Sequence, residues 1–96
     1  MKGIDFTQLH KETLEITMRT GITIHILPPT LEMVGDLQSC GEDLGSIKRA
    51  LSKILSHNKE LIKITEEEIS TYDFEDLTLL ANSVRGFVLE ITSKKH

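Results

Sequence analysis

Residues 12–30 read ETLEITMRTGITIHILPPT, and the pattern of this stretch decides the fold. Apolar and polar residues alternate over 12–18 and again over 22–26, which is typical of two half-buried β-strands. The connection between them is three residues long and ends in Gly21. Such a connection suits a type I turn closed by a residue in the left-handed conformation. We therefore predict a β-hairpin over about residues 12–27.

The length of the turn predicts the register of the hairpin. An isolated two-stranded hairpin is only marginally stable in water, so its apolar face must pack on the rest of the chain. We expect His25 to be a cross-strand partner of Glu15 rather than a catalytic base. The unpaired edges of the hairpin are a candidate contact, because such an edge can accept a strand from a neighbour. The predicted pairs are Met18–Ile22, Ile16–Ile24 and Leu14–Ile26 on the apolar face, and Thr17–Thr23 and Glu15–His25 on the polar face.

Helices are predicted after the hairpin. Pro28 and Pro29 end the second strand, because proline has no amide hydrogen to give to the ladder. Thr30, Thr65 and Asp73 are typical N-cap residues, and Gly41 breaks or bends the chain between the first two helices. The predicted helices cover residues 31–39, 42–56, 66–71 and 74–92.

Apolar residues recur on one face of the two longest predicted helices, which indicates a shared core. The fold class is therefore α+β: an N-terminal two-stranded hairpin packed on three to four helices, in a single domain of residues 1–96. The predicted core residues are Leu44, Ile47, Leu51, Ile54 and Leu55 on the second helix, and Phe74, Leu77, Leu80, Ala81, Val84, Phe87, Val88 and Ile91 on the last.

Composition excludes several classes of function. The net charge is −4 and basic residues form no stripe, which argues against nucleic-acid binding as the main activity. No apolar run approaches the ~20 residues that a membrane helix needs, and residues 1–5 do not resemble a signal peptide. We expect a cytosolic protein with no membrane partner.

The sequence predicts no catalytic centre. It contains no glycine-rich phosphate loop, no nucleophile motif and no pair of cysteines or histidines at metal-ligand spacing. The lone Cys40 is expected to be a small residue at a helix end. We therefore expect no enzymatic activity, no cofactor and no metal. The histidines that lack a second ligand at such spacing are His10, His25, His57 and His96.

A second seam on the last predicted helix is the positive indication of function. Leu79, Asn82, Gly86 and Leu89 follow one another at spacings of three, four and three residues, off the core face. A glycine inside a helix costs roughly 1 kcal/mol relative to alanine and is tolerated where another backbone approaches closely. The seam is a candidate contact with a partner or a second subunit. The alternative is that both leucines are ordinary exposed residues, or that other parts of this chain cover them.

The chain resembles the tail assembly chaperones of long-tailed bacteriophages and prophages of Gram-positive hosts. The resemblance lies in residues 14–30, from the hairpin to the Pro-Pro-Thr helix entry, and in the stretches 54–60, 64–68 and 72–80. It implies a protein that binds and solubilises the tape measure protein, helps recruit tail tube subunits and forms homo-oligomers. It also implies action in the host cytoplasm and absence from the mature virion.

Other functions remain open. The main alternative is a small regulatory adaptor or inhibitor that acts on one folded protein. A weaker one is a DNA-binding regulator that uses Lys48, Arg49 and Lys53, although the net charge and the lack of a helix-turn-helix argue against it. Members of the resembled family often have a longer frameshift product, and Lys94-Lys95 could be encoded by a slippery A-rich run. The same residues could equally be a solvated tail.

Overall fold

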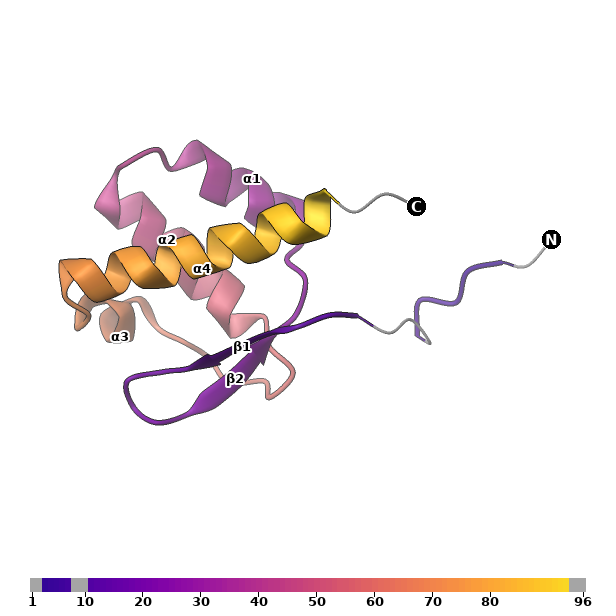
Figure 1. Cartoon of the computed structure of the whole chain (residues 1–96), viewed down its shortest axis with the longest axis horizontal. Helices are drawn as coiled ribbons and strands as arrows, with labels where there is room; N and C mark the ends of the chain where they lie inside the picture. Colours follow the sequence, from indigo (N-terminus) through magenta and orange to yellow (C-terminus); the bar gives the residue numbers. More distant parts are fainter. Residues whose placement is uncertain (1–2, 8–10, 94–96) are drawn as a thin grey trace.

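The structure is a computed structural model, and it describes residues 3–7 and 11–93. His10 and residues 94–96, which include the Lys94-Lys95 pair, lie outside the described residues. The described part forms an antiparallel hairpin followed by four helices, which confirms the predicted α+β fold (Figure 1). The elements are β1 (Leu14–Thr17), β2 (Thr23–Ile26), α1 (Leu31–Ser39), α2 (Leu44–Ser56), α3 (Glu66–Ser70) and α4 (Phe74–Thr92).

The hairpin has the predicted register, with Leu14 opposite Ile26 and Thr17 opposite Thr23. Gly21 has a φ of +90°, so the turn uses the left-handed residue that the sequence predicts. One side chain differs from the prediction. The predicted pairing puts Ile22 on the apolar face, but its side chain is 44% exposed, because it lies beside the turn, one residue before β2 begins.

Each helix begins after a side chain that accepts a backbone N–H, which satisfies one of the free donors at a helix start. Thr30, Thr65 and Asp73 cap α1, α3 and α4 as predicted. The cap of α2 is Asp43, so this helix begins at residue 44 and not at 42. Gly41, with a φ of +59°, ends the helical path between α1 and α2.

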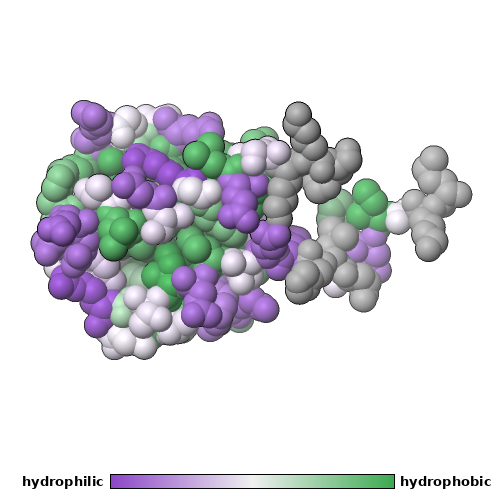
Figure 2. All heavy atoms as spheres, viewed as in Figure 1, coloured by the Kyte–Doolittle hydropathy of each residue, from purple (hydrophilic) through white to green (hydrophobic). Residues whose placement is uncertain are grey.

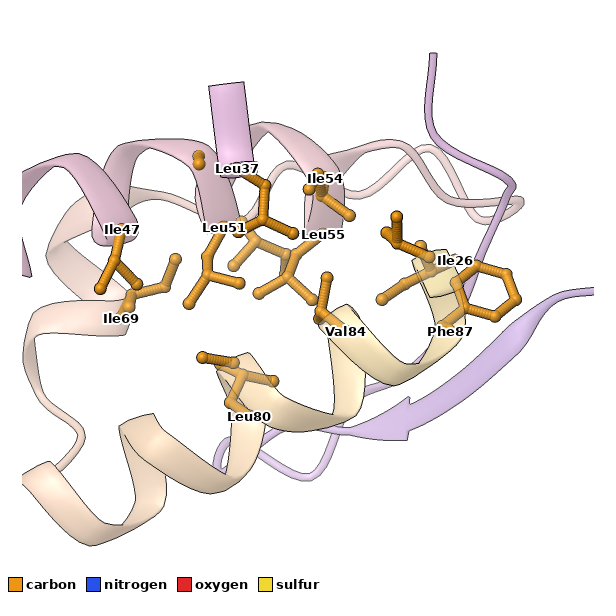
Figure 3. Close-up of a cluster of buried hydrophobic side chains, with 14 of the residues drawn as sticks. Ile26, Leu37, Ile47, Leu51, Ile54, Leu55, Ile69, Leu80, Val84 and Phe87 are labelled. Carbon is orange, nitrogen blue, oxygen red and sulfur yellow. The ribbon is translucent and has the colours of Figure 1, made fainter. Parts of the chain in front are cut away.

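The core lies where α2, α4 and β2 meet. In Figure 3 the side chains of Leu51 and Leu55 on α2 point toward Val84 on α4, and Ile26 of β2 lies next to Phe87. Leu51, Ile54, Leu55 and Val84 are completely buried. The inward face of α4 and the stripe on α2 are therefore in the positions that their periodicity predicts.

Two predicted core residues are exposed instead. Leu44 is 51% exposed and Phe74 is 70% exposed, and each is the first residue of its helix. A helical side chain leans toward the N-terminus and covers the preceding turn. The first residue has no preceding turn to cover, so its side chain extends past the end of the helix. Leu31, the first residue of α1, is 89% exposed in the same way.

The loop after α2 is held by a buried polar side chain. Asn58 is 2% exposed; its Nδ2 donates to the carbonyl oxygens of Leu55 at 2.7 Å and of Ile62 at 2.8 Å. Its Oδ1 accepts the Ile62 N–H at 3.0 Å. These bonds replace the water that the loop's backbone groups would otherwise require, and they hold the loop beside β2.

Candidate interaction surface

The four seam residues lie together on the outer face of α4. Leu79 and Leu89 are 67% and 66% exposed, and Asn82 and Gly86 are exposed as well. Ten residues of helix separate the two leucines by about 15 Å along the axis. Figure 2 shows apolar surface on the side of the molecule where α4 runs, with the largest apolar area between α4 and the hairpin. Within the described residues, therefore, no other element covers the seam.

Gly86 is not required by the fold of this chain. A Cβ atom built on Gly86 would meet no atom within 4 Å, and the residue does not have a positive φ. Its environment resembles that of Gly35 in α1, where an added Cβ also meets nothing. Alanine would fit both helices and would favour them by roughly 1 kcal/mol.

Each end of the seam borders a groove. Leu79 lies beside Ile16, Tyr72 and Leu80 in a groove of about 320 Å³ between α4 and the hairpin. Leu89 lies beside Leu37 and Val88 in a smaller groove of about 180 Å³ between α4 and α1. The seam therefore has one groove beside Leu79 at its start and another beside Leu89 at its end.

A larger groove than these two lies at the start of α4. Its volume is about 450 Å³, and the exposed Leu44 and Phe74 line it together with Asn82 of the seam. Sequence periodicity missed this site, because it placed Leu44 and Phe74 in the core. The available signal was their position immediately after the capping residues Asp43 and Asp73. The other residues that line this groove are Gly41, Glu42, Ile47, Leu77, Thr78, Ala81 and Arg85.

Arg19 joins the hairpin turn to the start of α4. Its guanidinium lies 3.3 Å from a carboxylate oxygen of Asp76 and 5.4 Å from the centre of the Tyr72 ring. The backbone N–H of Arg19 also donates to the Tyr72 hydroxyl at 2.9 Å. Because the Arg19 side chain is 52% exposed, its charge remains accessible at the edge of the Leu79 groove.

A charged cluster closes the outer edge of β2. The predicted His25–Glu15 pair is present, with Nε2 of His25 3.2 Å from Glu15. Sequence reasoning missed Glu60, whose Oε2 lies 2.6 Å from His25 Nδ1 and whose Oε1 accepts the His25 backbone N–H. The hydrogen bond to Glu60 raises the pKa of His25, with a smaller contribution from Glu15. The hydrogen bonds from His25 lower the pKa of Glu60.

Within the described residues, one edge of the hairpin is occupied and the other is open to strand addition. On β2, the Leu27 N–H donates to the His57 carbonyl and the Lys59 N–H donates to the His25 carbonyl. The prediction that the hairpin edges could accept a strand is therefore wrong for β2, because residues of the loop after α2 occupy that edge. β1 has β2 as its single strand partner within the described chain.

Cys40 is the C-terminal capping residue of α1, as its predicted place at a helix end requires. It is buried, and its thiol donates to the carbonyl oxygen of Asp36 at 3.0 Å. Burial raises the pKa of this thiol. Among the residues that the structure describes, no group of three or more histidine, cysteine or acidic side chains is placed to hold a metal ion.

Comparisons with known proteins give this chain no relative: no family model, no curated protein and no solved structure matches it significantly. None of the helices in the described ranges is long and apolar enough to cross a membrane.

Proposed function

We propose that this chain is a tail assembly chaperone of a long-tailed bacteriophage or prophage. It binds the tape measure protein and keeps it soluble before the tail tube assembles around it. The function consists of binding and involves no enzymatic chemistry, cofactor or metal. It takes place in the host cytoplasm, and the protein leaves before the virion is complete.

The observation that carries this proposal is the groove at the start of α4. Leu44 and Phe74 are large apolar side chains that remain 51% and 70% exposed beside a groove of about 450 Å³. A groove between two helices is a common docking place for the apolar face of a third helix. The tape measure proteins of the resembled family are long and rich in apolar helices, and they would aggregate if those faces stayed uncovered.

The charge of the chain suits the same function. A net charge of −4 would keep a complex with an apolar partner in solution, since acidic residues favour solubility. One groove of this size binds a single helix weakly, but many copies along a long partner gain avidity from repetition. Self-association, and recruitment of the tail tube protein, belong to the same proposal.

Co-expression tests the proposal. The partner is the tape measure protein encoded by the long open reading frame expected directly downstream of this gene. We expect soluble tape measure protein when the wild-type chain is present. The variant Leu44→Asp with Phe74→Asp should leave most of it insoluble, because a carboxylate in each wall of the groove disfavours an apolar helix.

The control is Leu31→Asp, which places one such charge on another exposed first residue of a helix, away from the groove. It should preserve solubilisation. If the wild-type chain does not solubilise the tape measure protein, or no such reading frame lies downstream, the chaperone proposal is wrong. An adaptor that binds one folded protein then becomes the better explanation of the groove.

A further inference from the structure

The spacing of the seam residues on α4 is the same when read in either direction along the helix. Leu79, Asn82, Gly86 and Leu89 are separated by three, four and three residues, so the spacing is symmetric about residue 84. An antiparallel copy of the helix, related by a two-fold axis near that residue, places Leu79 opposite Leu89 of the second copy. It also places Asn82 opposite Gly86. A two-fold contact needs a self-complementary surface of this kind.

We propose that α4 packs against α4 of a second copy in antiparallel orientation, with these four residues as the contact. Spacings of three and four residues are those of the a and d positions of a coiled coil, which line a single narrow seam. The core already uses the face of α4 that carries Leu80 and Val84. The second copy therefore packs on the opposite face.

This arrangement gives a physical reason for glycine at position 86. The fold of the single chain does not require glycine there, because an added Cβ would meet no atom within 4 Å. In the dimer Gly86 lies at the centre of the contact, opposite Asn82 of the second copy. The missing side chain lets the two helix backbones approach closely and leaves room for the Asn82 side chain.

The grooves beside the seam offer further apolar surface to the second copy. A specific interface buries roughly 1,200–2,000 Å² in total, which is more than four leucine side chains can supply. Antiparallel packing also brings Leu89 of the second copy to the groove of about 320 Å³ beside Leu79. Leu79 of the second copy reaches the groove of about 180 Å³ beside Leu89. The contact thus extends beyond the helices onto the hairpin and α1.

Charged residues at the rim also meet in this orientation. Asp76, Ser83 and Glu90 recur at seven-residue spacing, and the first two line the Leu79 groove. Antiparallel pairing places Glu90 of the second copy at the Asp76 end of that groove. The half-exposed Arg19, which is paired with Asp76 there, places a positive charge at this end and offsets the repulsion between Asp76 and the incoming carboxylate.

This inference rests on the self-association in the proposed function, but it does not depend on the tape measure protein. Disulfide trapping tests it in the full chain, with Cys40→Ser to remove the native thiol. Leu79→Cys and Leu89→Cys are prepared as separate variants, oxidised alone and as an equimolar mixture, and compared on non-reducing gels. Because residues 79 and 89 face each other only in the antiparallel pair, we expect the cross-linked dimer in the mixture and little in either variant alone.

Sedimentation equilibrium of the otherwise unmodified chain provides the second measurement. The molar mass should rise with concentration toward that of a dimer or a multiple of it. Leu79→Asp with Leu89→Asp should raise the dissociation constant at least tenfold, whereas the control Leu31→Asp should not change it. Circular dichroism checks that each variant remains folded.

Three results would overturn the inference. Cross-linking of each single-cysteine variant with itself would indicate a parallel pair. A monomeric mass at all concentrations, with no cross-link in the mixture, would exclude self-association through α4. The Leu79→Asp, Leu89→Asp variant could also lose tape measure binding while its molar mass equals that of the wild-type chain at every concentration. The seam would then be a contact with the tape measure protein and not with a second copy. Failure of the chaperone proposal alone would leave the cross-linking pattern intact.

Discussion

Asn58 is polar and 2% exposed, whereas Leu79 is apolar and 67% exposed. The first lies in the loop after α2, and the second lies on the outer face of α4. Every hydrogen bond of the Asn58 side chain goes to a backbone group of its own loop or of the end of α2. Leu79 borders a groove that other parts of the described chain leave open.

The comparison distinguishes side chains that the fold requires from side chains that it leaves available for contact with another molecule. A buried asparagine is stable only when its donors and acceptor have partners, so the loop and the asparagine depend on each other. An exposed leucine contributes little to the stability of a single chain. Its apolar surface becomes favourable only when another molecule covers it, and for this reason the outer face of α4 is the better candidate for function.

The largest expected difference is between two leucines. Leu51→Ala removes a completely buried side chain of α2 and should lower the free energy of unfolding by about 2–5 kcal/mol, through lost burial and a cavity. Leu79→Ala should change it by less than about 0.5 kcal/mol at concentrations where the chain is monomeric. Urea denaturation measures both. Equal losses would mean that Leu79 is covered within the chain.

The two asparagines give the next comparison. Asn58→Ala should lower the free energy of unfolding by about 2–3 kcal/mol, because it leaves the Ile62 N–H and two carbonyl oxygens without their partner. Asn82→Ala changes an exposed residue of α4 and serves as the control, with an expected change below about 0.5 kcal/mol. Urea denaturation again provides the measurement, and a small effect at Asn58 would show that water replaces its bonds.

Local sequence rules predicted most of the fold. The hairpin register follows from period-two alternation and a three-residue turn that ends in Gly21, and the caps Thr30, Thr65 and Asp73 set three helix starts. These features depend on neighbours in sequence, so a single sequence contains them. The start of α2 was predicted two residues early, because Asp43 and not an earlier residue provides the cap.

The parts that sequence reasoning missed depend on residues far apart in the chain. Glu60 meets His25 across 35 positions, and no local pattern indicates that contact. Helical periodicity places Leu44 and Phe74 on the same side of their helices as the core residues. It gives no information on whether another element lies beyond the end of the helix to cover them. The seam on α4 could be predicted because it needs only the helix itself, whereas the grooves beside it needed the positions of α1 and the hairpin.

Substitution of two helical glycines tests the same comparison with a smaller expected change in the free energy of unfolding. Gly35→Ala and Gly86→Ala should each raise the free energy of unfolding of the monomer by about 0.5–1 kcal/mol, because alanine favours a helix and both sites have room for a Cβ. Only Gly86→Ala should also weaken self-association, since its Cβ enters the proposed contact. Sedimentation of the two variants side by side distinguishes them. Equal association would remove the reason for glycine at position 86.

The smallest expected effect is the pH dependence of the cluster that closes the edge of β2. Hydrogen bonding to Glu60 raises the pKa of His25 above its ordinary value of 6.5. A raised pKa in the folded state means that its contribution to stability is complete below about pH 6.5 and is lost as the pH rises through the raised value. Hydrogen bonds from His25 lower the pKa of Glu60 below its ordinary 4.5, so that contribution is present above about pH 4.5 and is lost as the pH falls.

The cluster should therefore be most stabilising between about pH 4.5 and 6.5. His25→Gln tests this, because glutamine can still donate a hydrogen bond to Glu60 but does not titrate. The melting temperature of the wild-type chain should fall more steeply from pH 6 to pH 8 than that of the variant, and the difference isolates His25 because both proteins retain His57. Since the His25 side chain is 37% exposed, solvent weakens the pair and the shift should be small. None of the four seam residues titrates, so between pH 6 and pH 8 the pH dependence of self-association should not follow that of unfolding; if the two changed together, the hairpin edge and the seam would be coupled.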